Sequence, residues 1–456
     1  MIATPMMGCG AHGVLAQGTR IQAPRAASIA FAPGAVTPEA PFTRTFSVDA
    51  EGEGVLELTA RVPGGDWALA GREAATVRVF VDGVYNQDIV LTMGETQHDY
   101  KVSLGALKPG VHTIAAERFA PFSAPGLTQI VIDGAVVSVV TPDSPEYEAL
   151  ANAPILVSRE APHRTDALLL MYYEVTPHPD GRSTLRYTPV FSNEDGGTAT
   201  RALMARWGRT VDIDWAFAQR RDRNGKIEEE SYQAWLHMTR RFNGKRDGRH
   251  PFLQIASNNN IFSDSVNGPL RLRPAPAMRF EHGSYAREEV LDRFPWTYQL
   301  MVKELFRERK SSPDFYQQPA LLGDSIGDPR RFVFVEFKQE SGGRGVAAGI
   351  KLKNMPDVFT SNRGEKGLQA ERDGWCRVAV ELPRTVTVDD IERLELFGLG
   401  RGNARVTAVR KVIVLDEQYQ PQFLPITWEG EGDLKRDEDR VTVYGIKPIP
   451  PADRPQ

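Results

Sequence analysis

The sequence contains few cysteines and no long apolar run. Of its 456 residues only Cys9 and Cys376 are cysteines, too few for a four-thiolate zinc site or a dense disulfide framework. No apolar segment approaches the roughly 20 residues that a membrane-spanning helix needs. Charge of one sign is also lacking, because 55 basic and 59 acidic residues leave a net charge of −4. That balance argues against general electrostatic attraction to nucleic acid or to an anionic membrane.

Several catalytic motifs are missing as well. The chain has no Gly-x-Ser-x-Gly nucleophile elbow, no Walker phosphate loop, no dinucleotide-binding fingerprint and no His-Glu-x-x-His motif. Each of these motifs places particular atoms at a fixed spacing for one kind of chemistry. Their absence argues against nucleotide-driven work and against α/β-hydrolase chemistry.

Short alternating segments separated by turn residues are abundant. The composition, with 41% hydrophobic and 25% charged residues, is that of a globular chain, and 40 glycines with 32 prolines favour many turns. Asp82-Gly83 separates the alternating runs 76–81 and 84–91, and an Asp-Gly pair in this setting is a strong β-hairpin signal because both positions need positive φ. About seven such runs between residues 42 and 141 predict an antiparallel β-sandwich.

The remaining chain predicts a mainly β, multi-domain protein. We expect a disordered leader at 1–41, the N-terminal β-sandwich at 42–141, a larger β-rich main domain at 150–420 and an irregular tail at 421–456. The main domain divides near 320–330 if it has two sub-domains. One or two helices are expected within 285–310, the second starting at Pro295. A shorter helix is expected at 198–207, with Thr198 as N-cap and Gly208 as its stop.

Acids, tryptophans and a histidine gather in the middle of the chain. Glu194 ends a predicted strand just before a Gly-Gly turn, and Asp212 and Asp214 flank Ile213 so that they share one face of a strand. In a strand through 232–237, His237 shares a face with Trp235. Paired carboxylates serve as acid and as nucleophile or base in glycoside hydrolysis. We therefore take Glu194, Asp212, Asp214 and His237 as candidate catalytic residues, with His237 a proton carrier or a metal ligand.

Candidate substrate contacts lie beside these residues. Trp215 and Trp235 could stack on sugar rings, and Asn258 and Asn260 belong to an Asn triplet that offers donors and acceptors. The same carboxylate and amide oxygens could instead bind Ca²⁺. An alternative remains open, in which Asp212 and Asp214 lie on a solvated strand face. In that case they would be neutralised by one of three arginines: Arg206, Arg209 or Arg220.

Two partial resemblances accompany these patterns. The 77–91 hairpin and the turn Lys108-Pro109-Gly110-Val111-His112 look like those of carbohydrate-binding modules. The stretch from Ala153 to about Asp264 resembles the domain of the vacuolar-protein-sorting-sixty-two type proteins. The matching pieces are Ala153-Pro154-Ile155-Leu156, Asp212-Ile213-Asp214-Trp215 and residues 251–260, although an Asn triplet stands where that family tends to carry His. This second resemblance implies an all-β middle region and transfers no catalytic residue.

Together these observations favour an extracellular or envelope carbohydrate-active protein. It would be a glycoside hydrolase or a lyase acting on a polysaccharide. The alternative is a non-catalytic carbohydrate-binding or adhesion protein that uses the same surfaces. Carboxyl groups about 5–5.5 Å apart would fit a retaining glycosidase, and a separation of about 6.5–9.5 Å an inverting one.

Overall fold

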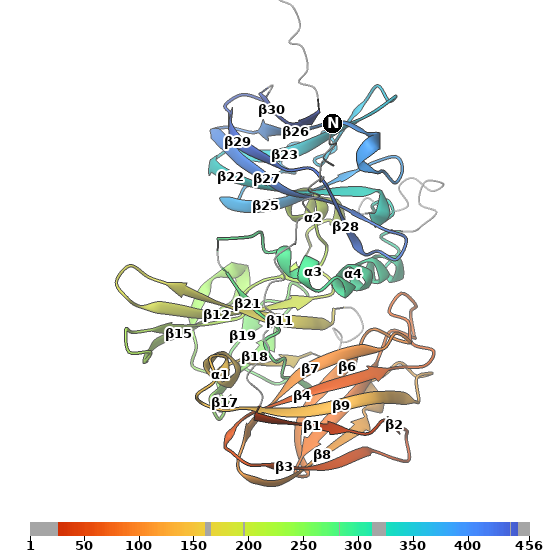
Figure 1. Ribbon diagram of the computed structural model, residues 1–456, viewed down its shortest axis with the longest axis vertical. Coiled ribbons are helices and arrows are strands. Elements are labelled where there is room, and N and C mark those ends of the chain that lie inside the picture. Colours follow the sequence, from red (N-terminus) through yellow and green to blue (C-terminus); the bar gives the residue numbers. More distant parts are fainter. Residues whose placement is uncertain are drawn as a thin grey trace, which may run out of the picture.

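A computed structural model describes residues 26–159, 166–194, 197–281, 283–311, 325–437 and 439–445. Three β-rich units follow one another along the longest axis of the molecule, with the N-terminal sandwich at one end and the C-terminal sandwich at the other (Figure 1). Most of the regular structure in these ranges is strand. The expected fold class, a mainly β chain with an N-terminal antiparallel sandwich and few helices, is confirmed.

The N-terminal unit consists of two antiparallel sheets around one apolar core. One sheet has the order β1–β9–β4–β7, with β2 also paired to β9, and contains β1 (Ala26–Phe31), β2 (Gly34–Val36), β4 (Gly52–Arg61), β7 (His98–Leu107) and β9 (Ile130–Val140). The other has the order β3–β8–β5–β6 and contains β3 (Phe42–Val48), β5 (Ala75–Val81), β6 (Val84–Leu91) and β8 (Gly110–Arg118). The predicted turn joins β5 to β6, with φ of 51° at Asp82 and 76° at Gly83.

The leader expected at 1–41 is wrong from Ala26 onward, and residues 1–25 lie outside the described ranges. Strand β1 pairs antiparallel with β9, and β2 pairs with the other end of β9. Val36 is fully buried and Ile29 and Phe31 pack against the core. The segment lacks a sustained local period, so its strands depend on pairing with a partner distant in sequence. Their addition also covers an otherwise unpaired edge of β9.

The middle unit also contains two sheets. The smaller has the order β17–β18–β10–β20, with β19 also paired to β18, and contains β10 (Ile155–Ser158), β17 (Arg246–Asp247), β18 (His250–Ile255), β19 (Phe262–Ser263) and β20 (Leu270–Leu272). The larger has the order β16–β15–β14–β12–β11–β21, with β13 also paired to β12, and contains β11 (Leu168–Pro177), β12 (Ser183–Phe191), β13 (Asp212–Ile213), β14 (Phe217–Arg221), β15 (Ile227–Gln233), β16 (Thr239–Arg241) and β21 (Arg279–Phe280).

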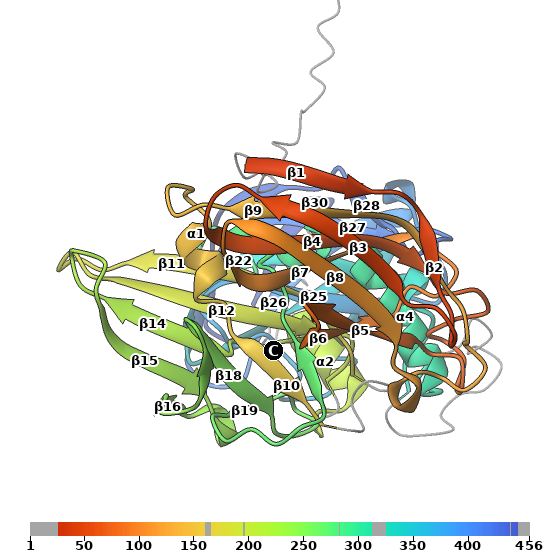
Figure 2. The same ribbon diagram turned by 90° about the horizontal axis from the view of Figure 1, so that it is seen from below.

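Two long hairpins of the larger sheet extend away from the body of the molecule (Figures 1 and 2). The β11–β12 hairpin joins two strands across the turn that contains Pro179, Asp180 and Gly181. The β14–β15 hairpin turns at Asn224-Gly225, where the Asp222 N–H donates to the Lys226 carbonyl at 2.9 Å and Gly225 has a φ of 81°. Both turns contain residues that favour tight turns, so their chemistry is local to a few positions.

Four α-helices lie in the described part of the chain: α1 (Tyr147–Ala151), α2 (Thr200–Trp207), α3 (Glu289–Arg293) and α4 (Trp296–Arg307). The last three lie between the middle unit and the C-terminal sandwich (Figure 1). Helix α4 follows Pro295 as expected and buries Leu300, Met301 and Leu305. Gly208 ends α2 in the left-handed conformation, also as expected. Thr198 does not cap α2, since the helix starts from Ala199 without a side-chain cap.

The C-terminal unit is a second antiparallel sandwich. One sheet has the order β25–β22–β27–β28, with β29 also paired to β27, and the other has the order β24–β23–β26–β30. The strands are β22 (Phe332–Gly342), β23 (Gly345–Leu352), β24 (Val358–Thr360), β25 (Gly374–Glu381), β26 (Ile391–Leu399), β27 (Asn403–Leu415), β28 (Pro421–Leu424), β29 (Trp428–Leu434) and β30 (Arg440–Gly445).

The irregular tail expected at 421–456 is therefore wrong for residues 421–445, and residues 446–456 lie outside the described ranges. Strands β28 and β29 extend one sheet and β30 extends the other. Leu434 and Val443 are buried in the core while most of their neighbours in sequence are polar and more exposed. These edge strands bury few side chains, so their composition resembles that of a loop.

Specific contacts join the N-terminal sandwich to the middle of the molecule. The indole N–H of the fully buried Trp67 donates a hydrogen bond to Glu304 on α4. Nε2 of His250 lies 3.2 Å from a carboxylate oxygen of Glu53 on β4, with both side chains buried. These buried polar contacts fix the orientation of the sandwich against β18 and α4. No helix among the described residues is long and apolar enough to cross a membrane.

Candidate functional site

The candidate acidic residues meet at one end of the larger middle sheet. Strand β13 pairs antiparallel with the end of β12, which puts Asp212 opposite Phe191. Just beyond β12, the backbone N–H of Glu194 donates to the Thr210 carbonyl at 3.1 Å. The Gln233 N–H donates to the Ala216 carbonyl at 3.3 Å and so brings the end of β15 to the same place. We call Glu194, Asp212, Asp214 and His237 the acid cluster.

Asp212 is the innermost member of the acid cluster. Its side chain is buried, and one carboxylate oxygen accepts a hydrogen bond from Nδ2 of Asn260 at 3.0 Å. Burial raises the pKa of Asp212 well above its usual range, and the negative charges of Asp214 and Glu194 raise it further. Asn260 is itself buried and has a positive φ of 42°. This environment favours the protonated form of the Asp212 carboxyl group.

Glu194 lies at the edge of the acid cluster. Burial raises its pKa, the Arg209 guanidinium acts in the opposite direction, and the charge of Asp214 raises it again. Nη1 of Arg209 lies 4.0 Å from the Glu194 carboxylate, and Thr198 donates a side-chain hydrogen bond to it. The Thr198 side chain thus hydrogen-bonds to Glu194 and does not cap α2. The net direction is upward, so Glu194 keeps its proton to a higher pH than an exposed glutamate.

Asp214 and His237 form the accessible side of the acid cluster. Nδ1 of His237 lies 3.4 Å from one Asp214 carboxylate oxygen, and Nη1 of Arg287 lies 3.7 Å from the other. The Asp214 side chain is 23% exposed and that of His237 is 58% exposed. The acid cluster therefore has a buried end at Asp212 and a solvent-accessible end at Asp214 and His237.

His237 reaches the acid cluster by an unexpected route. The predicted strand 232–237 ends at Gln233, and Trp235–His237 form a 3₁₀ turn in which Leu236 and His237 have φ of 55° and 56°. Strand alternation therefore does not place His237 on a face with Trp235. Instead Nε2 of the buried Gln233 lies 2.7 Å from Nδ1 of His237 and holds the ring towards Asp214.

The candidate substrate contacts are only partly assembled at the cluster. Trp235 is 65% exposed, as is its neighbour Leu236, and Trp215 is half-buried with the Arg186 guanidinium 5.5 Å from its ring. Asn260 contacts the acid cluster through Asp212, but it is buried and not open to a substrate. Asn258 points elsewhere, because its Oδ1 accepts from Nη2 of Arg159 at 2.6 Å. The prediction that both asparagines line a sugar site receives no support from these positions.

The alternative of a solvated strand face is wrong for Asp212, which is buried. Of the three arginines considered as its neutralising partners, only Arg209 faces the cluster. Arg206 donates instead to the Gly367 carbonyl at 2.8 Å, and Arg220 pairs with Glu229 at 3.0 Å. Arg209 is buried and also binds Glu288, with Nε 3.1 Å from its carboxylate oxygen. Its position follows from the left-handed Gly208, which ends α2 and turns the chain inward.

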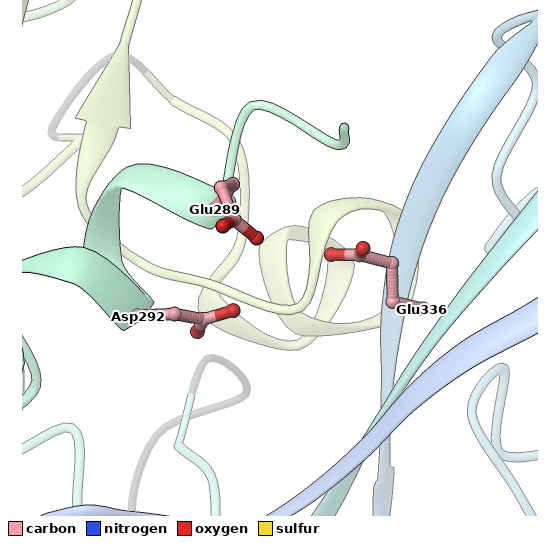
Figure 3. Close-up of side chains that lie close together, drawn as sticks. All are labelled: Glu289, Asp292 and Glu336. Atoms are coloured by element: carbon pink, nitrogen blue, oxygen red, sulfur yellow. The ribbon is translucent and has the colours of Figure 1, made fainter. Parts of the chain in front are cut away.

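Three acidic side chains lie closest together at a different place, between α3 and β22. Glu289 and Asp292 of α3 and Glu336 of β22 point toward one another (Figure 3). One carboxylate oxygen from each of them lies within 4.8 Å of the other two. In the described ranges no corresponding set of three carboxylate or imidazole donors occurs in the acid cluster. The acid cluster therefore does not present three closely spaced ligand atoms for the Ca²⁺ ion considered above.

Cationic side chains already occupy the space between Glu289, Asp292 and Glu336. Nη2 of the fully buried Arg377 lies 2.7 Å from Asp292 and 2.7 Å from Glu336. The Lys411 ammonium contacts Asp292 at 2.7 Å and also contacts Glu289. Because these cations neutralise the carboxylates, the group is a buried ion-pair network and not a metal centre.

Comparisons with known proteins give little further information. No protein-family model matches the chain, and no curated protein matches it. Solved structures that overlap parts of it include three carbohydrate-related proteins. They are a ruminal GH26 endo-β-1,4-mannanase (14% identity, 24% of this chain and 19% of that one, TM-score 0.18), the EclA C-terminal sugar-binding domain (14%, 28% and 86%, 0.18) and the Podospora anserina GH26-CBM35 β-(1,4)-mannanase (12%, 25% and 29%, 0.17).

Likeness at this level identifies neither a fold shared over the whole chain nor a shared ligand. The overlap also spans less than a third of either mannanase. The resemblance of residues 153–264 to vacuolar-protein-sorting-sixty-two type domains is not tested by these comparisons and stays a prediction.

Proposed function

We propose that the acid cluster cleaves glycosidic bonds, with Glu194 as general acid and Asp214 as base or nucleophile. The observation that carries this proposal is the contrast between the two carboxyl groups. Burial raises the pKa of Glu194, whereas Asp214 is more open and faces the Arg287 guanidinium and His237. Two neighbouring carboxyl groups in opposed environments are the arrangement by which acid and base roles are divided.

The other members of the cluster support these two residues. Asp212 is too buried to touch a substrate and is a positioning residue, which Asn260 holds by a hydrogen bond at 3.0 Å. Arg209 moderates the rise in the pKa of Glu194. His237 lies against Asp214 and is exposed enough to exchange protons with solvent.

An exposed aromatic surface beside the acids fits a sugar chain as substrate. Trp235 projects into solvent from the same short turn as His237, and the face of an indole ring packs well on the C–H face of a sugar ring. Half-buried Trp215 directly follows Asp214. The proposed substrate is therefore a polysaccharide or other glycan, and an extracellular or envelope location belongs to the same proposal.

The test compares Asp214→Asn and Glu194→Gln with the unaltered protein on a panel of polysaccharides. Release of reducing ends and of unsaturated products should fall by about 10²–10⁴-fold in each variant, the usual contribution of a positioned acid or base. Glu229→Gln is the matched control, because Glu229 is an exposed carboxylate of the same sheet that pairs with Arg220. Unchanged turnover in Asp214→Asn would remove the proposed roles.

A second candidate function is carbohydrate binding without catalysis. The exposed Trp235–Leu236 pair favours it, since such a surface can hold a glycan without any acid–base step. Under this alternative, Trp235→Ala abolishes retention on a polysaccharide, Asp214→Asn retains it, and the unaltered protein releases no product from any member of the panel.

A further inference from the structure

A cleft of about 600 Å³ lies between the N-terminal sandwich and the middle unit, built from elements other than those of the acid cluster. One wall is the outer face of the sheet formed by β7, β4 and β9. The opposite wall consists of residues 168–170 of β11, the end of β20 with the segment that follows it, and the turn 293–296 between α3 and α4. Its volume lies within the range of about 300–1,000 Å³ typical of small-ligand sites.

The sandwich wall of the cleft carries polar side chains among apolar ones. Strand register places Glu57 opposite Lys101 and Val55 opposite Ser138, so that polar side chains of three neighbouring strands point outward into the cleft. Glu57 is half-buried and lines the cleft from β4. Hydrogen-bonding groups on a rigid sheet are well placed to select a polar ligand.

Aromatic rings close one end of the cleft. The His98 ring packs edge-on against Trp296, with ring centroids 4.5 Å apart, and against Tyr100 at 4.8 Å. Burial lowers the pKa of His98 to about 4, so the imidazole is neutral at physiological pH and offers one donor and one acceptor. Aliphatic side chains of 168–170 face this end across the cleft.

The charges that line the cleft are balanced. Three acids and three bases take part: Glu57, Asp88, Asp99, Lys101, Arg273 and Arg293. Several already have partners elsewhere, since Asp88 pairs with Arg78 at 2.8 Å and Arg273 with Asp247 at 2.8 Å. A phosphate or carboxylate ligand would therefore find no excess of positive charge.

From these features we infer that the cleft is a second binding site, and that it takes an uncharged saccharide of one or two rings. A sugar ring presents hydroxyl groups at its rim and C–H groups on its faces. The polar strands of the sandwich match the rim, and the aromatic and aliphatic wall matches a face. This inference does not depend on whether Glu194 and Asp214 are catalytic.

Binding is measured by calorimetry on the full chain with three neutral disaccharides, namely maltose, cellobiose and mannobiose. Glucuronic acid and glucose 6-phosphate are the charged counterparts. Ser138→Phe fills the cleft and should weaken binding of the neutral probe by about tenfold or more. Val111→Phe is the control, because Val111 is 71% exposed on β8 and does not line the cleft. Glu57→Ala provides a second variant, should Ser138→Phe fail to fold.

Each outcome decides the inference. Loss of binding in Ser138→Phe or Glu57→Ala with retention in Trp235→Ala supports the cleft, as does slower amide hydrogen exchange at 98–102 and 293–296 on saturation. Loss in Trp235→Ala alone assigns the sugar to the acid cluster and overturns the inference. Tighter binding of the charged probes overturns the ligand class. No binding of any neutral probe up to about 10 mM overturns the site.

Discussion

Replacing Arg377 by methionine tests whether the ion-pair network between α3 and the C-terminal sandwich is structural. The guanidinium is fully buried, and Nη1 donates to Asp292 at 2.9 Å and to the Tyr298 hydroxyl at 2.8 Å. Nη2 donates to Asp292 and to Glu336, each at 2.7 Å. Methionine keeps much of the aliphatic volume and removes all four hydrogen bonds.

The expected cost follows from the charges that remain. Lys411 still pairs with Asp292, whereas Glu336 loses its charged hydrogen-bonding partner. Removing one partner of a buried ion pair typically costs about 3–5 kcal/mol of the free energy of unfolding. Burial already raises the pKa of Glu336, and the Arg377 charge opposes that rise. The Arg377→Met variant can therefore protonate Glu336, which limits the cost to about 3 kcal/mol.

The sign of the pH dependence follows from the same reasoning. In the variant the pKa of Glu336 in the folded state lies further above its unfolded value, so proton uptake stabilises the folded state as pH falls. The difference in free energy of unfolding between the variant and the unaltered protein should therefore become smaller as the pH falls from about 8 to about 5. A deficit that stays constant across this interval would show that Glu336 does not take up the proton.

Urea unfolding at both pH values measures the effect. Arg405→Met is the matched control, because Arg405 pairs with Asp433 at 3.1 Å on the exposed surface, where solvent screens the pair, and its loss should leave the free energy of unfolding nearly unchanged. The double variant Arg377→Met/Glu336→Gln should recover part of the loss, since it removes the uncompensated carboxylate. A cost below about 1 kcal/mol for Arg377→Met would refute the structural role of the network.

Two further predictions concern other sites. The pKa of folded His98 is about 4 against an ordinary 6.5. Acidification from pH 6.5 to 4 should therefore lower the free energy of unfolding of the unaltered protein by about 3 kcal/mol more than that of His98→Phe. Parallel curves of stability against pH for the two proteins would contradict this. Leu236 is 65% exposed at a φ of 55°, so Leu236→Asn should raise the free energy of unfolding by about 0.5–1 kcal/mol in calorimetry. A lower melting temperature would indicate that Leu236 makes a stabilising contact.

Much of the local structure was predictable from the sequence. The turns at Asp82-Gly83 and Asn224-Gly225 and the helix end at Gly208 lie where the sequence places them, because residues tolerant of positive φ specify these features within a few positions. The residue types of the acid cluster and the closeness of Asp212 to Asp214 in the chain were visible as well. The mainly β fold class follows from the same short-range alternation.

Other features needed partners distant in sequence. Strands at 26–36 and 421–445 form because β9, β26 and β27 offer edges for them. A strand pattern could not show that His237 turns back at Leu236, nor that Asn258 binds Arg159 while Asn260 holds Asp212. In each case the deciding contact is made with a residue distant in the chain, which local sequence does not specify.

Sequence alone therefore determined which chemical groups the middle region carries and the turns that shape its hairpins. Tertiary structure decided which carboxyl group is buried and which is open, and created the cleft between the sandwich and the middle unit. Backbone preferences act over a few residues, whereas desolvation and charge act through space. Trp67 and Glu304 illustrate the difference. They lie far apart in the chain and share a buried hydrogen bond that no local sequence pattern predicts.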